Sequence, residues 1–545
     1  MKNYKSMVKN IERNFSIIKY LFSFLITVAS FQTTHNIRYC LICMAELFAI
    51  MFVSKILQSK SRKVGVIFNT VFMLLYNVQV MVLYFGNSYV LLVMLTNLSS
   101  LNGLSGKSAE YICGAVLVLV FSILPLPERT SYKIDMATKL LTFVLAFELA
   151  LTLLWGNIYS PLFGVYNLAM DGYEWIKRQE SIGNEENITA EFYKAGVDSY
   201  REKDVNLVDT PNVVVIMTEG LSQNIIEDDR EIMPNIAEFP KKSLNFKRYY
   251  NHTFSTYRGI IGQLYSGYQL DNLDVNTLVS LQDIFRQHGY ESIFINTEPL
   301  NTQFTEYINA MNFDRIVGDA NSKLSGNSNT MTDKDAYDSL FDVLSQSDSD
   351  KPLFITMYTF GTHASFDSPD QKYGDGSDRL LNKFYNLDFQ FGEFIDKFNS
   401  SALSENTVLI FTTDHATFAD SDYTHSFPEK NRRNNMLDEI PLSIYYKGIL
   451  PEEIDAEGRN SLDLAPTILD YLDLSSPNYF LGMSLFAPKQ NNNTYDTIFA
   501  VENTYYDTDG GDVADLSSVK REIIEVQMQK YLTAKTQEPE IILGN

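Results

Sequence analysis

The sequence predicts an N-terminal polytopic α-helical membrane domain of about five spans. A C-terminal α/β domain follows, with a mostly parallel sheet covered by helices on both faces. Three observations lead to this prediction. Long apolar runs fill the first 157 residues, and short β-branched runs alternate with helical stretches after about residue 210. The charge also reverses: there are 14 Lys/Arg and 6 Asp/Glu through Tyr159, against 30 and 61 in the remainder.

Five apolar runs in the first part are long enough to cross a hydrocarbon core about 30 Å thick, which takes roughly 20 residues of helix. They cover residues 14–32, 38–57, 64–86, 109–127 and 136–157. We interpret the shorter run at 89–95 as re-entrant or interfacial, and a sixth span there would invert the topology. The first run lacks a small-residue cleavage site and further spans follow it, which excludes a cleaved signal peptide.

Basic residues gather in three of the predicted loops, which the positive-inside rule places in the cytoplasm. They are Lys2, Lys5, Lys9 and Arg13, then Lys55, Lys60, Arg62 and Lys63, and finally Arg129 and Lys133. Five spans satisfy this alternation and put the chain after about residue 158 outside the cytoplasm. We therefore expect a transmembrane domain at 1–157, linker helices at the membrane face at 158–210, and an extracytoplasmic domain at 211–545.

The second part contains continuous β-branched runs, which are typical of strands buried on both faces. They lie at residues 212–217, 292–296, 353–359, 407–412 and 441–446. Helical stretches such as 277–288 and 378–398 separate them, and this alternation implies a mostly parallel sheet. Ligands of such sheets bind outside the carboxyl ends of the strands, so the functional residues are expected there.

Composition excludes several functions for the second part. Its strongly acidic balance argues against binding to nucleic-acid backbone, which requires clustered Lys and Arg. Cys40, Cys43 and Cys113 all lie in the apolar first part. The second part therefore has no disulfide framework, cysteine nucleophile or Cys-ligated zinc site.

Polar residues follow two of the predicted strands. Glu219 comes directly after the first, and Asp414 and His415 come directly after the run at 407–412. Carboxylate and imidazole together form a mixed ligand set suited to Zn²⁺ or Mn²⁺. Taken alone, an Asp-His pair is more often a surface pair, and Glu219 could cap a helix beginning at Leu221.

The segment HTFSTYRGIIGQLYSG at 252–267 offers a third element, a threonine followed by a helix with small residues. A hydroxyl at a helix N-terminus lies beside backbone N–H groups that can bind anionic oxygens. The simpler interpretation is that Thr256 only caps the helix.

In combination, these segments resemble the alkaline-phosphatase and sulfatase superfamily. Within it they are similar to the membrane-anchored branch of lipoteichoic acid synthases and phosphoethanolamine (phosphoglycerol) transferases. The matching segments are VVVIMTEG, FSTYRGIIGQLYSG, TMYTFGTHASF, FTTDHATF, DYTHSF and NSLDLAPTILDYL. The resemblance covers the membrane part and about residues 212–487, and it implies an alkaline-phosphatase-like fold. A single Glu219 after the first strand, and a threonine in place of a sulfatase Cys or Ser, argue against sulfate-ester hydrolysis.

The resemblance implies a bacterial cell-membrane enzyme that holds one divalent cation, Zn²⁺ or Mn²⁺. Its expected ligands are Glu219, Asp414, His415 and the Thr256 hydroxyl. Thr256 would take a phosphoryl-linked head group from phosphatidylglycerol or phosphatidylethanolamine, and a hydroxyl of a surface glycan or glycolipid would then collect it. A phosphodiester hydrolase and a non-catalytic lipid-sensing relative are the alternatives. No segment identifies the head group.

Further residues are expected to assist. His363 and His425 match histidines that contact the phosphate and can protonate the leaving oxygen, a task suited to an imidazole pKa of about 6.5. Arg258 would contact phosphate or pair with an acidic neighbour. Glu298 and Asn301 are candidates for recognising the head group or the acceptor.

Overall fold

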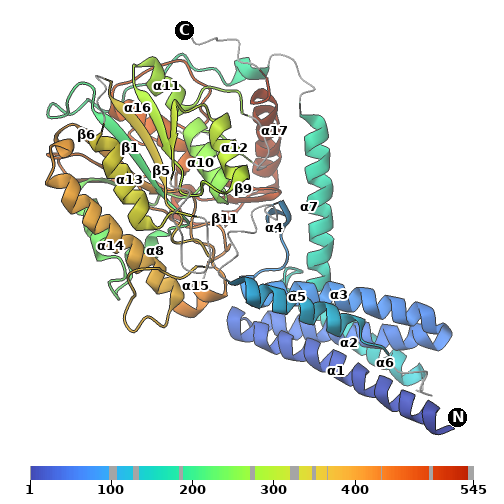
Figure 1. Cartoon of the computed structure of the whole chain (residues 1–545). Helices are drawn as coiled ribbons and strands as arrows, with labels where there is room; N and C mark the ends of the chain where they lie inside the picture. The colour runs from blue at the N-terminus through green and yellow to red at the C-terminus, as the bar shows by residue number, and fades with distance from the viewer. Residues whose placement is uncertain are drawn as a thin grey trace. The chain divides into compact units, whose positions relative to one another are not determined.

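The structure, a computed structural model, divides into two compact units (Figure 1). It describes residues 2–96, 107–126, 134–182, 188–269, 276–318, 330–346, 351–364, 366–430, 432–489 and 495–537. The helical unit contains Met1–Leu95, Lys107–Glu174 and Ala419–Asn431. The α/β unit contains Thr96–Gly106, Trp175–Phe418 and Arg432–Asn545.

Apolar helices form the helical unit, as the sequence predicts. They are α1 (Lys2–Thr34), α2 (Ile37–Lys60), α3 (Arg62–Gly86), α5 (Ser108–Ile123) and α6 (Ile134–Trp155). Within the described part of the chain, four segments are long and apolar enough to span a membrane: Asn14–Thr34, Ile37–Lys60, Arg62–Gly86 and Asp135–Trp155. Helix α5 has 16 residues, and the run at 89–95 contains only the short α4 (Leu92–Thr96). The loop with Arg129 and Lys133 lies outside the described residues.

Buried polar side chains join the membrane helices. Ser23 on α1 donates to Asn77 Oδ1 on α3 at 2.7 Å, and Asn77 Nδ2 donates to Ser122 Oγ on α5 at 2.9 Å. One turn along α1, the hydroxyls of Thr27 and Tyr76 lie 2.6 Å apart. Interhelical hydrogen bonds of this kind hold helices together where lipid removes the hydrophobic driving force. They specify how α1, α3 and α5 pack against one another.

The region after α6, where linker helices are predicted, begins with one long helix, α7 (Pro161–Ser181). Glu46 on α2 accepts a hydrogen bond from the Leu162 backbone N–H at 3.0 Å, which suits the positive end of the α7 dipole. In the rest of the predicted linker, the described residues contain a single helical turn, η2 (Ile188–Glu191), so the prediction of helices there is wrong beyond this turn. Lys194 instead forms a bridge to Asn478 through its backbone.

An eight-stranded sheet forms the centre of the α/β unit, in the order β4-β3-β5-β1-β6-β7-β2-β8. Its strands are β1 (Asn212–Thr218), β2 (Leu244–Lys247), β3 (Glu291–Ile295), β4 (Arg315–Val317), β5 (Leu353–Tyr358), β6 (Thr407–Thr413), β7 (Ser443–Tyr445) and β8 (Glu452–Asp455). All neighbours pair in parallel except β7, which is antiparallel to β6 and β2. The predicted parallel α/β architecture is confirmed.

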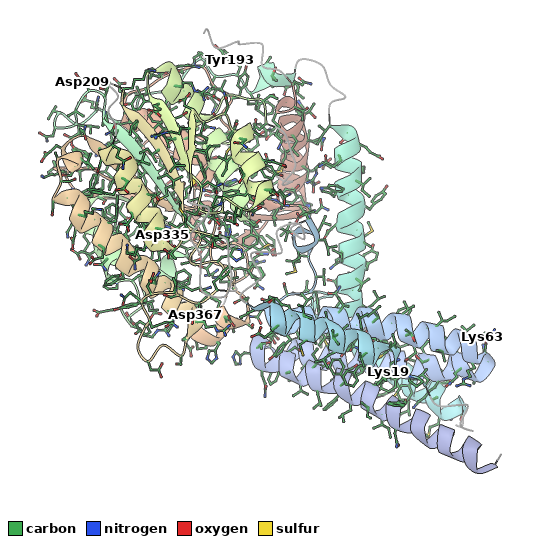
Figure 2. The ribbon with its side chains drawn as sticks, viewed as in Figure 1. Lys19, Lys63, Tyr193, Asp209, Asp335 and Asp367 are labelled. Atoms are coloured by element: carbon green, nitrogen blue, oxygen red, sulfur yellow. The ribbon has the colours of Figure 1, made fainter. Side chains whose placement is uncertain are left out.

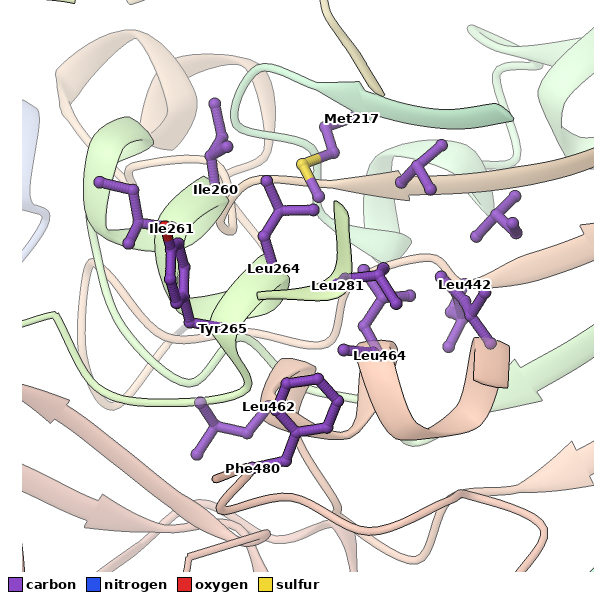
Figure 3. Packing of buried hydrophobic residues seen from close by; sticks show 14 of the residues in the cluster. Met217, Ile260, Ile261, Leu264, Tyr265, Leu281, Leu442, Leu462, Leu464 and Phe480 are labelled. Carbon is purple, nitrogen blue, oxygen red and sulfur yellow. The ribbon is translucent and has the colours of Figure 1, made fainter. Parts of the chain in front are cut away.

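Two groups of helices cover this sheet (Figure 1). The longer are α10 (Thr256–Tyr265), α11 (Leu281–Gln287), α12 (Thr302–Ala310), α13 (Asp333–Ser345), α14 (Arg379–Asn399) and α16 (Leu464–Tyr471). Helix α10 contacts α11 and α16, whereas α13 contacts α14. Figure 3 shows Met217 of β1 among Ile260 and Leu264 of α10, so the first buried strand and α10 share one apolar core.

A small antiparallel sheet follows, made of β9 (Ile498–Val501), β10 (Thr504–Asp507) and β11 (Ala514–Asp515). Helix α17 (Ser518–Ala534) comes after it. Figure 2 shows exposed residues from the two parts of the sequence: Asp209 at the margin of the α/β unit and Lys63 at an end of the helical bundle.

Candidate active site

Two neighbouring strands bring the predicted metal ligands together. Strands β1 and β6 pair in parallel with Thr218 opposite Thr413, so the residues that follow each strand emerge at the same edge of the sheet. Glu219 follows β1, and Asp414 and His415 follow β6. One ligand atom from each of these three side chains lies within 4.8 Å of the other two, and all three side chains are buried.

The potential ligand atoms of Glu219, Asp414 and His415 face one another. His415 Nε2 lies 3.5 Å from Glu219 Oε1 and 3.5 Å from Asp414 Oδ2. His415 Nδ1 lies 2.8 Å from the Ala416 carbonyl oxygen and can donate its proton there, so Nε2 is the ring nitrogen that faces the two carboxylates. Oriented in this way, His415 can act as a metal ligand.

The two carboxylate oxygens of Asp414 have different surroundings. Its Oδ1 accepts hydrogen bonds from the backbone N–H of Gly220 at 2.8 Å and of His415 at 2.7 Å. Its Oδ2 is fully buried and accepts no hydrogen bond. A buried carboxylate oxygen without a donor is costly unless a cation compensates it. This open oxygen, beside a second carboxylate and an imidazole nitrogen, fits one divalent cation.

The electrostatics of the group depend on the close approach of its members. Burial alone would raise the pKa of Glu219, but the hydrogen bond and positive charge of His415 outweigh burial and hold that pKa below its usual range. Burial and the negative charge of Glu219 raise the pKa of Asp414. Burial would lower the pKa of His415, yet Asp414 and Glu219 raise it to about 9. The group thus attracts positive charge to its centre.

Thr256 lies beside this group as the first residue of α10, with Ser255 as the N-cap residue. Its Oγ1 donates a hydrogen bond to Glu219 Oε2 at 3.0 Å, and the Tyr358 hydroxyl donates to the same oxygen at 2.7 Å. Unlike the three ligands, Thr256 is only half-buried. The threonine hydroxyl therefore lies next to the candidate cation site, at a helix N-terminus whose N–H groups favour anionic oxygens.

Two glycines explain how α10 and β1 come so close to β6. A Cβ at Gly259 would lie 2.1 Å from the Asp414 carbonyl oxygen, so a side chain there would push α10 away from the ligand. Gly220 has a φ of +50°, which L side chains rarely adopt, and it makes the turn after Glu219. These two requirements explain why glycine occupies positions 220 and 259.

His363 lies in a loop that is tied to the ligand strand. The preceding Thr362 Oγ1 donates to the Glu219 carbonyl oxygen at 2.5 Å, and Lys383 Nζ donates to the His363 carbonyl oxygen at 3.0 Å. The positive charge of His363 helps to lower the pKa of Glu219. His425 lies in α15 (Ser421–Ser426), which belongs to the helical unit.

Glu298 and Asn301 form a second polar group near the ligands. Asn301 Nδ2 donates to Glu298 Oε2 and to the Tyr257 hydroxyl, both at 3.1 Å. Burial raises the pKa of Glu298 to about 8, and the nearby charge of Glu219 acts in the same direction. Glu298 is therefore mainly protonated at neutral pH. Tyr257 is adjacent to Thr256, so this group borders the nucleophile candidate.

Arg258 pairs with an acidic neighbour, the second of the two roles expected for it. Its Nη2 donates to Glu502 Oε1 at 2.8 Å, and the side chains of Arg258 and Glu502 are 0 % and 7 % exposed. Glu502 lies in the turn between β9 and β10. The pair therefore joins the first turn of α10 to the small sheet, and the phosphate contact for Arg258 stays a prediction.

We predict that Arg258→Ala destabilises the α/β unit by about 3–5 kcal/mol, because it leaves Glu502 buried without its cation. Urea denaturation read by pulse proteolysis measures the loss. Arg433→Ala is the matched control: its pair with Asp515 is exposed at both side chains, 49 % and 68 %, and should contribute less than about 1 kcal/mol. Equal losses from both substitutions would contradict the prediction.

Three residues of this region are not anticipated by the sequence analysis. Tyr358 and Thr362 hold Glu219, and Glu502 holds Arg258. The position of Tyr358 could have indicated its role, because Tyr358 ends the strand beside β1 and so lies at the same edge of the sheet as Glu219. Glu502 carries no such signal, because its pairing depends on a turn 244 residues beyond Arg258.

The fold and the site together define an alkaline-phosphatase-like domain, a class that contains phosphotransferases and hydrolases. Residues 211–474 match the sequence profile of the Sulfatase family. The resemblance to the superfamily is confirmed. A search of curated protein sequences found no significant match.

Solved structures of similar fold were also found. A protein of the alkaline phosphatase superfamily from Vibrio parahaemolyticus matches with a TM-score of 0.51 and 18 % identity, over 66 % of this chain and 97 % of its own. This likeness shows the fold. A further match is the lipoteichoic acid synthase LtaP from Listeria monocytogenes, with a TM-score of 0.48 and 16 % identity over 63 % of this chain and 96 % of its own. Another is the lipooligosaccharide phosphoethanolamine transferase EptA from Neisseria meningitidis, with a TM-score of 0.49 and 14 % identity over 84 % of this chain and 95 % of its own.

Proposed function

We propose that the protein transfers a phosphoryl-linked head group, phosphoglycerol or phosphoethanolamine, from a membrane phospholipid to a hydroxyl of a cell-surface glycan or glycolipid. A phospho-threonine at Thr256 is the intermediate. One observation carries this proposal: the Thr256 hydroxyl lies 3.0 Å from Glu219, at a helix N-terminus, beside a ligand group that fits one divalent cation. A nucleophile and a charge-neutralising site are thereby adjacent.

Glu219, Asp414 and His415 would hold the cation, Zn²⁺ or Mn²⁺, with the Thr256 oxygen as a fourth ligand. When bound, the cation supplies charge neutralisation at the phosphoryl oxygens and acidifies the threonine hydroxyl. The protein itself orients the threonine hydroxyl and binds the phosphate oxygens. Glu219 orients the hydroxyl through its hydrogen bond, and the first N–H groups of α10 face the oxygens of the entering phosphate.

The two transfer steps need proton donors and acceptors. Thr256 Oγ1 releases its proton to water and attacks phosphorus, the bond to the diacylglycerol oxygen breaks, and His363 or His425 protonates that leaving oxygen. In the second step an acceptor hydroxyl loses its proton to the same, now neutral, histidine and displaces the Thr256 oxygen, which takes back a proton from water. Glu298 and Asn301 border Thr256 and would contact the head group or the acceptor.

The donor lipid requires a catalytic domain at the outer membrane surface. The basic loops support this topology. The α/β unit would then be extracytoplasmic on a multi-pass bacterial membrane protein.

A reporter enzyme that works only outside the cytoplasm should be active when fused after residue 160 and inactive when fused near Arg62. The reverse pattern would contradict the topology and the lipid donor with it.

The proposed reaction is tested with the purified full-length protein, Mn²⁺ or Zn²⁺, and phosphatidylglycerol or phosphatidylethanolamine labelled in both head group and acyl chain. We expect diacylglycerol release together with labelling of a glycosyl diacylglycerol acceptor. Diacylglycerol release with free labelled head group, whether or not the acceptor is present, would instead establish a hydrolase. Absence of turnover with every donor and either metal would favour a lipid-sensing relative.

A further inference from the structure

The turn between β9 and β10 binds the first turn of α10, which carries the candidate nucleophile. Glu502 stands in this turn, and its Oε1 accepts the 2.8 Å hydrogen bond from Arg258, two positions after Thr256. The segment that matches the Sulfatase family ends at residue 474, so both strands and their turn lie beyond it. The family match therefore assigns no role to this turn.

Strand β9 also binds the chain that leads into α10. The Ala500 backbone N–H donates to the His252 carbonyl oxygen at 2.9 Å, and the Thr253 hydroxyl donates to the Ala500 carbonyl oxygen at 2.7 Å. These contacts lie before Thr256 in the sequence, whereas the contact of Glu502 lies after it. The small sheet thus holds the nucleophile segment on both sides of Thr256.

The start of α10 needs such support from outside the helix. The first N–H groups of a helix have no partner within it, so helix ends fray unless other contacts fix them. Ser255, the N-cap residue, provides no side-chain cap. Arg258 Nη1 lies 3.5 Å from the Phe254 carbonyl oxygen, so one guanidinium joins the loop before α10 to the carboxylate of Glu502.

Arg178 holds the β9–β10 turn in place. It lies in the part of α7 that belongs to the α/β unit, which resumes at Trp175. Arg178 Nη1 donates to the Glu502 carbonyl oxygen at 3.1 Å, and Nη2 donates to Asn503 Oδ1 at 2.8 Å and to the Tyr505 hydroxyl at 3.2 Å. Glu502 has a φ of 46°, a conformation that a residue other than glycine keeps only where its surroundings fix it. Arg178 supplies that restraint.

We propose that Arg178 and Glu502 are positioning residues for the threonine nucleophile: Arg178 fixes the β9–β10 turn, and Glu502 fixes the first turn of α10 through Arg258. This inference rests on the proposed function, in which Thr256 attacks phosphorus. Attack requires the reacting atoms to lie about 3–3.5 Å apart, and a displacement of about 1 Å can cost roughly 100-fold in rate. Loosening the turn therefore slows attack by Thr256. It leaves the metal ligands in place, because they follow β1 and β6, which pair directly with each other.

The test uses the full-length protein with Arg178→Met, which removes the donors to the turn and leaves the buried pair of Arg258 and Glu502 intact. Arg201→Met is the matched control. Arg201 is also a half-buried arginine of the α/β unit, paired with a carboxylate at 2.9 Å and lying over an aromatic ring at 4.9 Å. It makes no contact with the β9–β10 turn in the part of the chain that the structure describes.

Formation of the Thr256 adduct from saturating phosphatidylglycerol or phosphatidylethanolamine, without acceptor, gives the first readout. Arg178→Met should lower the rate constant at least about tenfold, and Arg178→Lys should fall between it and the wild type. The final yield of adduct should stay the same, and the donor concentration at half-maximal rate should change less than about twofold. Damage to the fold would instead lower the yield at an unchanged rate constant. That result, or equal slowing by Arg201→Met, would overturn the proposal.

Hydrogen exchange gives a second readout that does not depend on the reaction. Backbone amides of residues 259–261, which close the first turn of α10, should exchange at least about fivefold faster in Arg178→Met, while amides of β1 and β6 keep their protection. Arg201→Met should leave both regions unchanged. Unchanged exchange at 259–261 in Arg178→Met would overturn the proposal. If the wild type forms no adduct, the proposed function fails, and the exchange rates show separately whether the turn holds α10.

Discussion

Thr256→Ala should abolish both the covalent intermediate and turnover, with a loss in kcat of roughly 10⁴- to 10⁶-fold, as for other enzymes that lose their nucleophile. The physical reason is that no other described hydroxyl donates a hydrogen bond to Glu219 from the start of α10. Diacylglycerol release from labelled phospholipid measures the loss. Thr256→Ser should keep partial activity, because a primary hydroxyl can take the same position.

Thr253→Ala is the matched control for this substitution. Thr253 lies three residues away, but its Oγ1 is buried and donates to the Ala500 carbonyl oxygen of β9 at 2.7 Å. It cannot attack a substrate without breaking that bond. We expect Thr253→Ala to retain the intermediate and turnover. If Thr253→Ala were inactive and Thr256→Ala active, the nucleophile would be misassigned.

Asp414→Asn should remove metal binding while leaving the α/β unit folded. The amide oxygen can still accept the hydrogen bonds that Gly220 and His415 donate to Oδ1, but the charge at the open Oδ2 is lost. In the wild type, saturating Zn²⁺ or Mn²⁺ should raise the unfolding temperature by about 3–8 °C. The variant should show no such rise and no measurable turnover. His415→Ala should likewise lose the metal response.

The unfolding temperatures of wild type and Asp414→Asn, measured without metal, show whether Asp414 is a metal ligand or a residue that stabilises the fold. Without metal, Asp414 and Glu219 repel each other, so the neutral asparagine should leave the metal-free unfolding temperature unchanged or raise it. Asp388→Asn is the control, because Asp388 is also buried and accepts a backbone hydrogen bond, from Ile236 at 2.7 Å, but lies outside the ligand group. It should keep the full metal response. A metal response retained by Asp414→Asn would show that the ligands are wrongly chosen.

The central strands could be predicted because they are buried on both faces. A strand such as β1 has parallel neighbours on either side, so every side chain from Val213 to Thr218 is apolar or fully buried, and the run is continuous. Strands β2, β4 and β8 escaped prediction for the opposite reason. They have three or four residues each and expose part of their side chains at or near the sheet margin, so they lack a clear pattern.

The candidate ligands could also be predicted, because a parallel sheet gathers the ends of its strands at one edge. The partners of these ligands could not. Tyr358 binds Glu219 only because β5 lies beside β1, and Lys107 binds Asp422 across 315 positions of sequence. Such pairs depend on tertiary packing that leaves no local pattern. The sequence around His425 identified a histidine, but it could not indicate that α15 packs against α1 and α3.

The proposed reaction depends on Thr256, which carries the head group between donor and acceptor. The most direct measurement is peptide mass spectrometry of full-length protein that has been mixed with phosphatidylglycerol or phosphatidylethanolamine and quenched without acceptor. We expect a phosphoglycerol or phosphoethanolamine adduct on Thr256, formed together with diacylglycerol and lost on addition of acceptor. An adduct mapped to Thr253 or Ser255, or diacylglycerol release with no adduct at any time, would contradict it.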